Sequence, residues 1–405
     1  MRETKYSNGV NLITERIPGI RSVAIGVWLK QGSAHESSDF LGISHILEHL
    51  VFKGTKQRDA REIALSLESL GGMLNAYTAR EHTGYQALVL DEHLPEALDV
   101  LADLVLYPRL DPEDLELERA VVLEEIASVE DAPDDLIFDL HSSRFWKGHP
   151  YGQMILGTRE TVSVLEIDDV CKLHEDKYTG NNIIVACAGD IDHEVVASHV
   201  AKLFGDASSG EICSDVDAPL ENLIGRDLVV RNTAQAHLVF GNQTPPHMDP
   251  ICEALILISS AFGGGMSSRL FQRIREEMAL AYSVFAYQSF YSRAGITGVY
   301  VGTRPENSSK ALESILAEYN LLYKEGLMAL ELEQIKAQVK GQMIISMEST
   351  VARLLRLAGY ALRGEPYKNL EESLARIDAV TLEEVNEACT RFFDPEDQYV
   401  MSMGP

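Results

Sequence analysis

Cysteine is scarce in this chain, and its thiols are scattered. The sequence has 5 cysteines among 405 residues. They are Cys171, Cys187, Cys213, Cys252 and Cys389. An odd number of widely separated thiols excludes a disulfide framework and offers no cysteine-ligated metal site. We therefore expect reduced thiols and a cytoplasmic location.

Long apolar runs are missing as well. The most apolar segments, 183–189 and 254–262, are far shorter than the roughly 18 residues that a membrane-spanning helix needs. Residues 1–6 resemble neither a signal peptide nor an Arg- and Ser-rich transit peptide. The sequence therefore predicts no membrane span and no targeting segment.

Basic side chains are the third shortage. The chain has 35 Lys and Arg against 62 Asp and Glu, which gives a formal net charge of −27. Proteins that bind nucleic acid or anionic membranes need a positive surface, so both of these partner classes are excluded. A negative field attracts cations, so the charge favours basic peptides as partners.

Helix and strand signals alternate along the whole chain. Residues 22–29 are apolar and rich in β-branched side chains, as in a buried strand. Residues 59–70 have the pattern of an amphipathic helix, and Gly71 and Gly72 follow it as a stop signal. Pro112 stands at the first position of a second, longer helix. This mixture predicts an α+β or α/β fold.

The sequence contains a weak internal repeat with a single offset. This offset leads from Ser22 to His237, where two strand-like segments begin. The same offset leads from Leu115 to Leu330, where two identical Leu-Glu-Leu-Glu tetrapeptides begin. One offset that serves several separated regions is difficult to explain by chance, so the repeat indicates a duplication.

This duplication predicts two domains of the same kind. The first covers residues 1–205 and the second covers residues 225–405. The joint between them, residues 206–224, is rich in Ser, Asp, Gly and Pro and is typical of a linker.

His45, Glu48 and His49 form an H-x-x-E-H pattern. Residues four apart share one face of a helix, so His45 and His49 can present two imidazoles to one metal ion. Glu48 lies beside the same position, where a carboxylate can accept a proton from water and pass it on. The pattern is the inverted form of the H-E-x-x-H zinc motif.

The alternative is a pair of surface histidines and a glutamate on an ordinary helix. The flanking residues are strongly apolar, which predicts a buried helix instead. They are Ile43, Ile46, Leu47, Leu50, Val51 and Phe52. Three polar groups on a buried helix are costly unless they are hydrogen-bonded or metal-bound, so the flanks favour a metal site.

A third protein ligand is needed, and the helix after Pro112 offers carboxylates for it. Glu118 and Glu125 are seven residues apart and share a face beside the apolar stripe of this helix. Glu116 and Glu124 are less well placed. Spacing alone gives Glu125 only a small advantage, because a solvated helix face explains any single glutamate here.

The second copy lacks the whole candidate site. Under the offset of the repeat, the three motif residues correspond to Ser260, Gly263 and Gly264. Glu125 corresponds to Lys340. One copy therefore keeps the candidate metal site, and we expect the other copy to serve a different purpose.

Further motifs extend along the chain. The segments are 42–55, 71–78, 81–85, 118–126, 149–152, 189–190 and the glycine-rich 263–271, followed by Arg275 and Tyr282. Together they resemble the pitrilysin/insulinase family of zinc peptidases, and within it half-length members similar to the mitochondrial processing peptidase β subunit. The resemblance implies two duplicated α+β domains, each a mostly antiparallel sheet packed with helices.

The resemblance also implies roles for the residues of the motif. His45, His49 and Glu125 would hold one Zn²⁺ per chain. Glu48 would act as the catalytic general base. Glu118 would assist catalysis by orienting a zinc ligand.

Substrate-binding residues follow from the same resemblance. Asn75 and Ala76 would lie on an exposed edge strand, where an extended peptide can pair with the backbone. Arg275 and Tyr282 would grip the substrate and stabilise the reaction intermediate; without the resemblance they read as a surface Arg and a core Tyr. His82 lies near the motif, but we expect it outside the metal ligands.

The implied function is that of a zinc metalloendopeptidase that cleaves peptides or unfolded, presequence-like segments. Full-length relatives enclose the peptide in four domains, whereas this chain supplies two, so a homodimer with a shared chamber is expected. A non-catalytic structural or binding subunit is the first alternative, and the intact zinc motif argues against it. A metal-dependent hydrolase of non-peptide substrates is the second.

Overall fold

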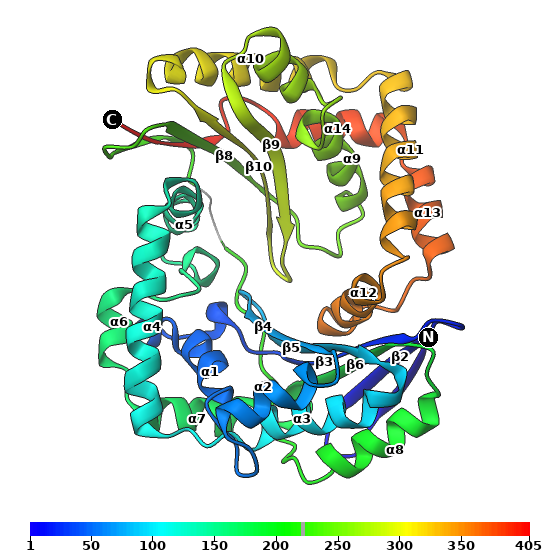
Figure 1. Ribbon diagram of the computed structural model, residues 1–405. Helices are drawn as coiled ribbons and strands as arrows, with labels where there is room; N and C mark the ends of the chain where they lie inside the picture. The colour runs from blue at the N-terminus through cyan, green and yellow to red at the C-terminus, as the bar shows by residue number, and fades with distance from the viewer. Residues whose placement is uncertain (220–222) are drawn as a thin grey trace. The chain divides into compact units, whose positions relative to one another are not determined.

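The computed structural model of the protein describes residues 1–219 and 223–405 (Figure 1). These residues separate into two compact units. The first unit contains residues 1–126, 153–214 and 345–367, and the second contains residues 127–152, 215–344 and 368–405. Among the described helices, none combines the length and the apolar character needed to cross a membrane.

The first unit is built on a six-stranded sheet with the strand order β1-β2-β6-β3-β5-β4. Strands β2 and β6 are parallel, and the other neighbours are antiparallel. The strands are β1 (Arg2–Lys5), β2 (Asn11–Arg16), β3 (Ser22–Leu29), β4 (Met73–Thr78), β5 (Thr83–Leu90) and β6 (Ile183–Gly189). Strand β4 therefore forms one edge of the sheet, while β3 and β6 lie in its interior.

Helices cover both faces of this sheet (Figure 1). Successive residues of a strand point to opposite faces. In β3, Ile25 joins the main core, whereas Trp28 faces α12. The helices of the unit are α1 (Ile43–Val51), α2 (Ala60–Glu68), α3 (Leu94–Leu106), α6 (Arg159–Val164), α7 (Ile167–Lys177), α8 (His193–Phe204) and α12 (Thr350–Leu362). Burial on both faces explains why β3 is apolar along its length.

The second unit repeats this architecture. Its sheet has the order β7-β11-β8-β10-β9, with β7 and β11 parallel and the other pairs antiparallel. The strands are β7 (Gly225–Val230), β8 (Ala236–Thr244), β9 (Ala281–Phe290), β10 (Gly295–Thr303) and β11 (Tyr399–Gly404). Five strands match five strands of the first sheet in the same order, so the predicted duplication of a mostly antiparallel α+β domain is confirmed.

The helices follow the same repeat. Helix α14 (Leu382–Phe392) is the counterpart of α7. Its first and last residues lie as far along the chain from the first and last residues of α7 as His237 lies from Ser22. The remaining helices are α4 (Pro112–Asp131), α5 (Pro133–Phe145), α9 (Cys252–Gly263), α10 (Ser308–Glu325), α11 (Ala329–Ser346) and α13 (Leu370–Ala379). In this series α10, α11 and α12 correspond to α3, α4 and α5.

One pair of corresponding helices is exchanged between the units. Helix α5 comes from the first half but belongs to the second unit, where the ring of His141 lies 5.0 Å from that of Tyr399. Helix α12 comes from the second half but belongs to the first unit, where Leu357 packs with Trp28. The compact units therefore differ from the predicted halves in these segments. The sequence repeat cannot reveal this exchange. The number of residues between two corresponding helices is the same whichever sheet each helix packs on.

The predicted linker has no regular secondary structure in its described part, 206–219 and 223–224. The carbonyl oxygens of Ser208 and Ser209 accept hydrogen bonds from the N–H groups of Gly180 and Asn181, so the start of the linker lies against the first unit, whereas its described residues from Asp215 onward belong to the second. Residues 220–222 of the linker lie outside the described residues.

Candidate metal centre

The helix that carries the H-x-x-E-H motif begins after a glycine. Gly42 precedes α1 with a φ of 91°, a left-handed conformation that residues with a Cβ disfavour. A Cβ atom at Gly42 would also lie 2.6 Å from the carbonyl oxygen of Leu156. Glycine is therefore required where the chain turns into α1.

A buried carboxylate holds the N-terminus of α1. Glu36 accepts hydrogen bonds from the backbone N–H groups of Gly42 and Ser44, both at 2.8 Å. N–H groups in the first turn of a helix lack partners within the helix and favour an anion. Burial has the larger effect on Glu36 and raises its pKa to about 7. No pattern in the sequence pointed to Glu36, which lies outside the helix.

The two histidines lie on one face of α1, with ring centroids 4.6 Å apart. His45 is only 7% exposed, so the alternative of two surface histidines is wrong. Burial, and to a lesser extent the neighbouring His49, lowers the pKa of His45 to about 4. The imidazole of His45 is therefore neutral near pH 7, which is the form that binds a metal.

Glu125, on α4, is the carboxylate that meets both imidazoles. Its Oε2 lies 3.6 Å from Nε2 of His45 and 3.7 Å from Nε2 of His49. The candidate ligand atoms of the three residues all lie within 4.8 Å of one another. No other three His, Cys, Asp or Glu side chains of the described chain form such a group. Glu116 and Glu124 are exposed, so the structure separates carboxylates that spacing could not.

The group has the properties that a zinc site requires. Ligands about 2.1 Å from a tetrahedral zinc ion lie roughly 3.4 Å from one another, close to the 3.6 and 3.7 Å observed. Oε2 of Glu125 is buried and has no hydrogen-bond partner, a condition that costs free energy unless a cation is supplied. The residues therefore fit zinc, and their binding of it stays a prediction.

Glu118 fixes the orientation of one imidazole. Its Oε2 lies 2.9 Å from Nδ1 of His49, and its Oε1 lies 2.5 Å from Nζ of Lys53. A carboxylate at Nδ1 favours the tautomer that carries its proton there, which leaves the Nε2 lone pair free for a metal. The contact with His49 is the one through which Glu118 would orient a zinc ligand, and that role stays a prediction; the resemblance implied no role for Lys53.

Glu48 lies on the same helix as both histidines. Its Oε2 accepts a 2.6 Å hydrogen bond from the hydroxyl of Thr78, the last residue of β4. Burial raises the pKa of Glu48, and the Thr78 hydrogen bond opposes that rise without cancelling it. Thr78 lies in segment 71–78, one of those that carry the resemblance, but the resemblance implies no role for it.

The strand that contains Asn75 and Ala76 forms the edge of the first sheet. Within β4, Asn75 pairs with Gln86 and Ala76 with Tyr85, both on β5. No strand of the described chain pairs with the other side of β4. An edge strand of this kind is the element to which an extended peptide can add by backbone hydrogen bonds.

His82 lies apart from the grouped ligand atoms. Its Nε2 is 3.3 Å from the hydroxyl of Tyr77, and its burial lowers its pKa to about 4. It does not belong to the group formed by the three candidate ligands.

Arg275 and Tyr282 lie together in the second unit. Arg275 is in a π-helical turn, Phe271–Glu277, and Tyr282 is the second residue of β9. The guanidinium carbon of Arg275 lies 4.4 Å from the centre of the Tyr282 ring, and its Nη1 donates to the Tyr282 carbonyl oxygen at 3.1 Å. Tyr282 is 78% exposed, so its interpretation as a core tyrosine is wrong.

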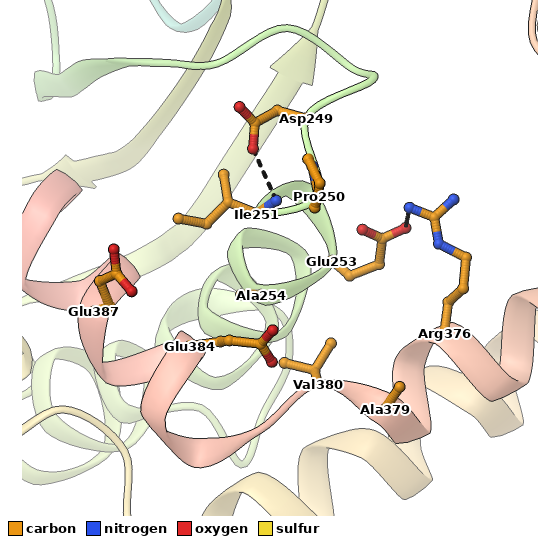
Figure 2. A pocket seen from close by; sticks show the side chains of 10 residues that line it. All are labelled: Asp249, Pro250, Ile251, Glu253, Ala254, Arg376, Ala379, Val380, Glu384 and Glu387. Carbon is orange, nitrogen blue, oxygen red and sulfur yellow. Dashed lines mark hydrogen bonds and ion pairs between the residues drawn. The ribbon is translucent and has the colours of Figure 1, made fainter.

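A pocket of about 370 Å³ opens in the second unit beside the start of α9 (Figure 2). Figure 2 shows that its charged side chains are largely used by the fold: Glu253 pairs with Arg376, and Asp249 accepts from the N–H of Ile251 at 3.0 Å. Glu384 caps the first turn of α14. The pocket therefore holds carboxylates, but no grouping of metal-ligand type.

Known proteins resemble this chain along most of its length. Residues 11–159 match the family model of insulinase (peptidase family M16), and residues 165–339 match that of the peptidase M16 inactive domain. The uncharacterized zinc protease YmxG of Bacillus subtilis is 39% identical over 98% of this chain and 97% of its own. The uncharacterized zinc protease SCO5738 of Streptomyces coelicolor is 35% identical over 95% of this chain and 85% of its own.

Solved structures share the fold. A protease from Helicobacter pylori superimposes with a TM-score of 0.93 at 22% identity, over 100% of this chain and 99% of that one. A peptidase M16 inactive domain from Pseudomonas fluorescens gives the same TM-score at 19% identity, over 100% and 97% of the two chains. At these identities the comparison concerns the fold alone.

Proposed function

Since the chain belongs to the insulinase family, peptidase family M16, we propose that it is a zinc-dependent endopeptidase. One observation carries the proposal. The unpartnered Oε2 of Glu125 lies 3.6 and 3.7 Å from the Nε2 atoms of two histidines on a single helix. Two imidazoles and a carboxylate, with space for water, are the ligand set of hydrolytic zinc enzymes.

The residues of the site divide the chemistry among them. His45, His49 and Glu125 would hold one zinc ion, which would supply Lewis acidity at the scissile carbonyl. Glu48 accepts a proton from the attacking water and returns it to the leaving amine. Glu118 keeps the Nε2 lone pair of His49 directed at the site through its 2.9 Å contact with Nδ1.

The substrate that this site favours is an extended peptide. The edge strand β4 offers backbone groups for pairing at Asn75 and Ala76, so unfolded or presequence-like segments fit better than folded proteins. The net charge of −27 favours basic peptides by long-range attraction. Equal cleavage at low salt of peptides matched in length but differing in Lys and Arg content would contradict the basic preference.

The active form that we propose is a homodimer with a shared chamber. The first unit carries the zinc residues, and the second carries Arg275 and the exposed Tyr282. In a dimer, Arg275 and Tyr282 of one protomer would complete the zinc site of its partner and help stabilise the oxyanion. Both sets occur on this one chain, so each dimer would have two active sites.

The test of the proposal measures zinc and cleavage together. The purified protein is incubated with a mixed peptide library, and the cuts are mapped by mass spectrometry. We expect cleavage by the wild type, about one zinc per chain and no cleavage by Glu48→Gln. Glu125→Gln should lose zinc, whereas Glu124→Gln, a matched change at the exposed neighbour, should keep it. A zinc-free active wild type, or a fully active Glu48→Gln, would contradict the proposal.

A further inference from the structure

Thr78 ends the edge strand β4 beside the motif helix. Successive strand residues point to opposite faces, so Thr78 shares a face with Leu74 and Ala76. Both of these side chains pack against the main core of the first unit, to which α1 also contributes. The Thr78 side chain is thereby directed toward α1, and only partly exposed.

The hydroxyl of Thr78 binds the carboxylate of Glu48. The Oγ1–Oε2 distance is 2.6 Å, typical of a strong hydrogen bond to a charged acceptor. The hydroxyls of Tyr85 and Tyr178 also interact electrostatically with Glu48. They form a 2.9 Å hydrogen bond with each other. Thr78 therefore holds Glu48 from outside the motif helix.

The hydrogen bond ties the flexible side chain of Glu48 to the stiffer side chain of Thr78. Glu48 has three rotatable side-chain bonds, whereas a β-branched threonine on a strand has a restricted χ1. Anchoring Oε2 leaves Oε1 as the oxygen that exchanges protons. A general base must be held within hydrogen-bond reach of its proton, so this restriction has a direct effect on rate.

We propose that Thr78 is a positioning residue for peptide hydrolysis, which holds the Glu48 carboxylate in its reactive orientation and ties it to the strand on which the substrate docks. The inference rests on the proposed function. The proposed peptide-pairing residues, Asn75 and Ala76, lie on the same strand, three and two positions before Thr78. A shift of β4 would therefore move the docking edge and the base together.

The test compares Thr78→Val, which removes the hydroxyl but keeps the branched shape, with Thr78→Ser, which keeps the hydroxyl. We expect Thr78→Val to lower kcat about 10- to 100-fold, part of the usual contribution of a general base, with KM, zinc content and unfolding temperature near those of wild type. Thr78→Ser should stay within about threefold of the wild-type kcat, because it restores the bond.

The outcomes separate this inference from the proposed function. If the wild type cleaves peptides and Glu48→Gln does not, the function stands, and a Thr78→Val enzyme with wild-type kcat contradicts the inference alone. An equal loss of kcat in Thr78→Val and Thr78→Ser also overturns the inference. So does a loss of kcat that accompanies a lower zinc content or a lower unfolding temperature in both variants. A wild type that cleaves no peptide overturns the function and the inference with it.

Discussion

His49 and Glu118 are joined by a 2.9 Å contact between Nδ1 and Oε2, although 69 residues separate them in the chain. Lys53 neutralises the other oxygen of the same carboxylate at 2.5 Å. The Glu118 carboxylate, paired with the partly exposed Lys53, thus holds the His49 ring at its Nδ1 side. Glu118 is buried, so its partners are fixed by the packing of α4 on α1 rather than by solvent.

The first prediction concerns this contact. Glu118→Gln keeps the side-chain shape but removes the charge that both His49 and Lys53 need. Losing such an outer carboxylate typically weakens metal binding about 10- to 100-fold. Competition with a chelator of known affinity measures the change. Glu116→Gln, at an exposed position on the same helix, is the control and should bind zinc as the wild type does. Equal affinities in all three proteins would contradict the orienting role.

The second prediction concerns the cap of α1. The pKa of Glu36 rises from 4.5 in the unfolded chain to about 7 in the folded one, so the folded state keeps its proton to higher pH. Stability from this group is fully present below about pH 4.5 and falls as the pH rises to about 7, by at most roughly 3 kcal/mol.

Denaturant unfolding of the wild type and Glu36→Gln at several pH values measures this effect. Glutamine does not titrate, so the free energy of unfolding of the wild type relative to the variant should decrease from pH 4.5 to 7. The groups that titrate in both proteins cancel in this difference. A difference that stays constant or increases over the same range would contradict the prediction.

The third prediction concerns helix α12, which the second half of the chain contributes to the first unit. Leu357 is fully buried in the cluster that contains Trp28 and Ile184. Leu357→Ala should lower the free energy of unfolding by about 2–5 kcal/mol, because it leaves a cavity in that cluster. Leu355→Ala, at a residue of the same helix that is 41% exposed, should change it by less than about 0.5 kcal/mol. An effect of Leu357→Ala in urea unfolding as small as that expected for Leu355→Ala would show that α12 does not stabilise this sheet.

The sequence predicts local features of the site well and its long-range contacts poorly. The four-residue spacing of His45 and His49 determines that they share a helix face, and their apolar flanks predict burial. The choice of Glu125 over Glu124 depends on how α4 packs on α1, which no spacing within one helix reveals. Glu36 and Thr78 reach the motif helix from a loop and an edge strand, so they carry no periodic signal.

The repeat likewise predicts local structure but not long-range contacts. A constant offset between the two halves predicts matching strands and helices, because each copy buries the same apolar pattern. It does not tell whether α5 covers the sheet of its own half. The contact of His141 with Tyr399 on β11 resolves that question, and it depends on tertiary packing alone.

The last prediction concerns the proposed sharing of active sites. In a shared-site dimer, Glu48→Gln damages the first unit of a site, and Arg275→Ala damages the contribution of the partner's second unit. Each variant alone should be inactive. In a heterodimer of the two, both lesions fall in one site and the other site is intact. Random pairing makes about half of the dimers heterodimers, so an equal mixture after co-expression should recover about a quarter of wild-type activity.

A matched mixture decides whether this recovery reflects shared sites. Glu48→Gln and Glu125→Gln both damage the first unit, so every dimer of that pair has a lesion in each site and should stay inactive. Peptide cleavage per milligram of dimer, measured for both mixtures, gives the comparison. Recovery in neither mixture would show that each chain builds its site from its own residues. Recovery in both would show that the subunits exchange more than the Arg275 side chain, which a simple two-site dimer does not allow.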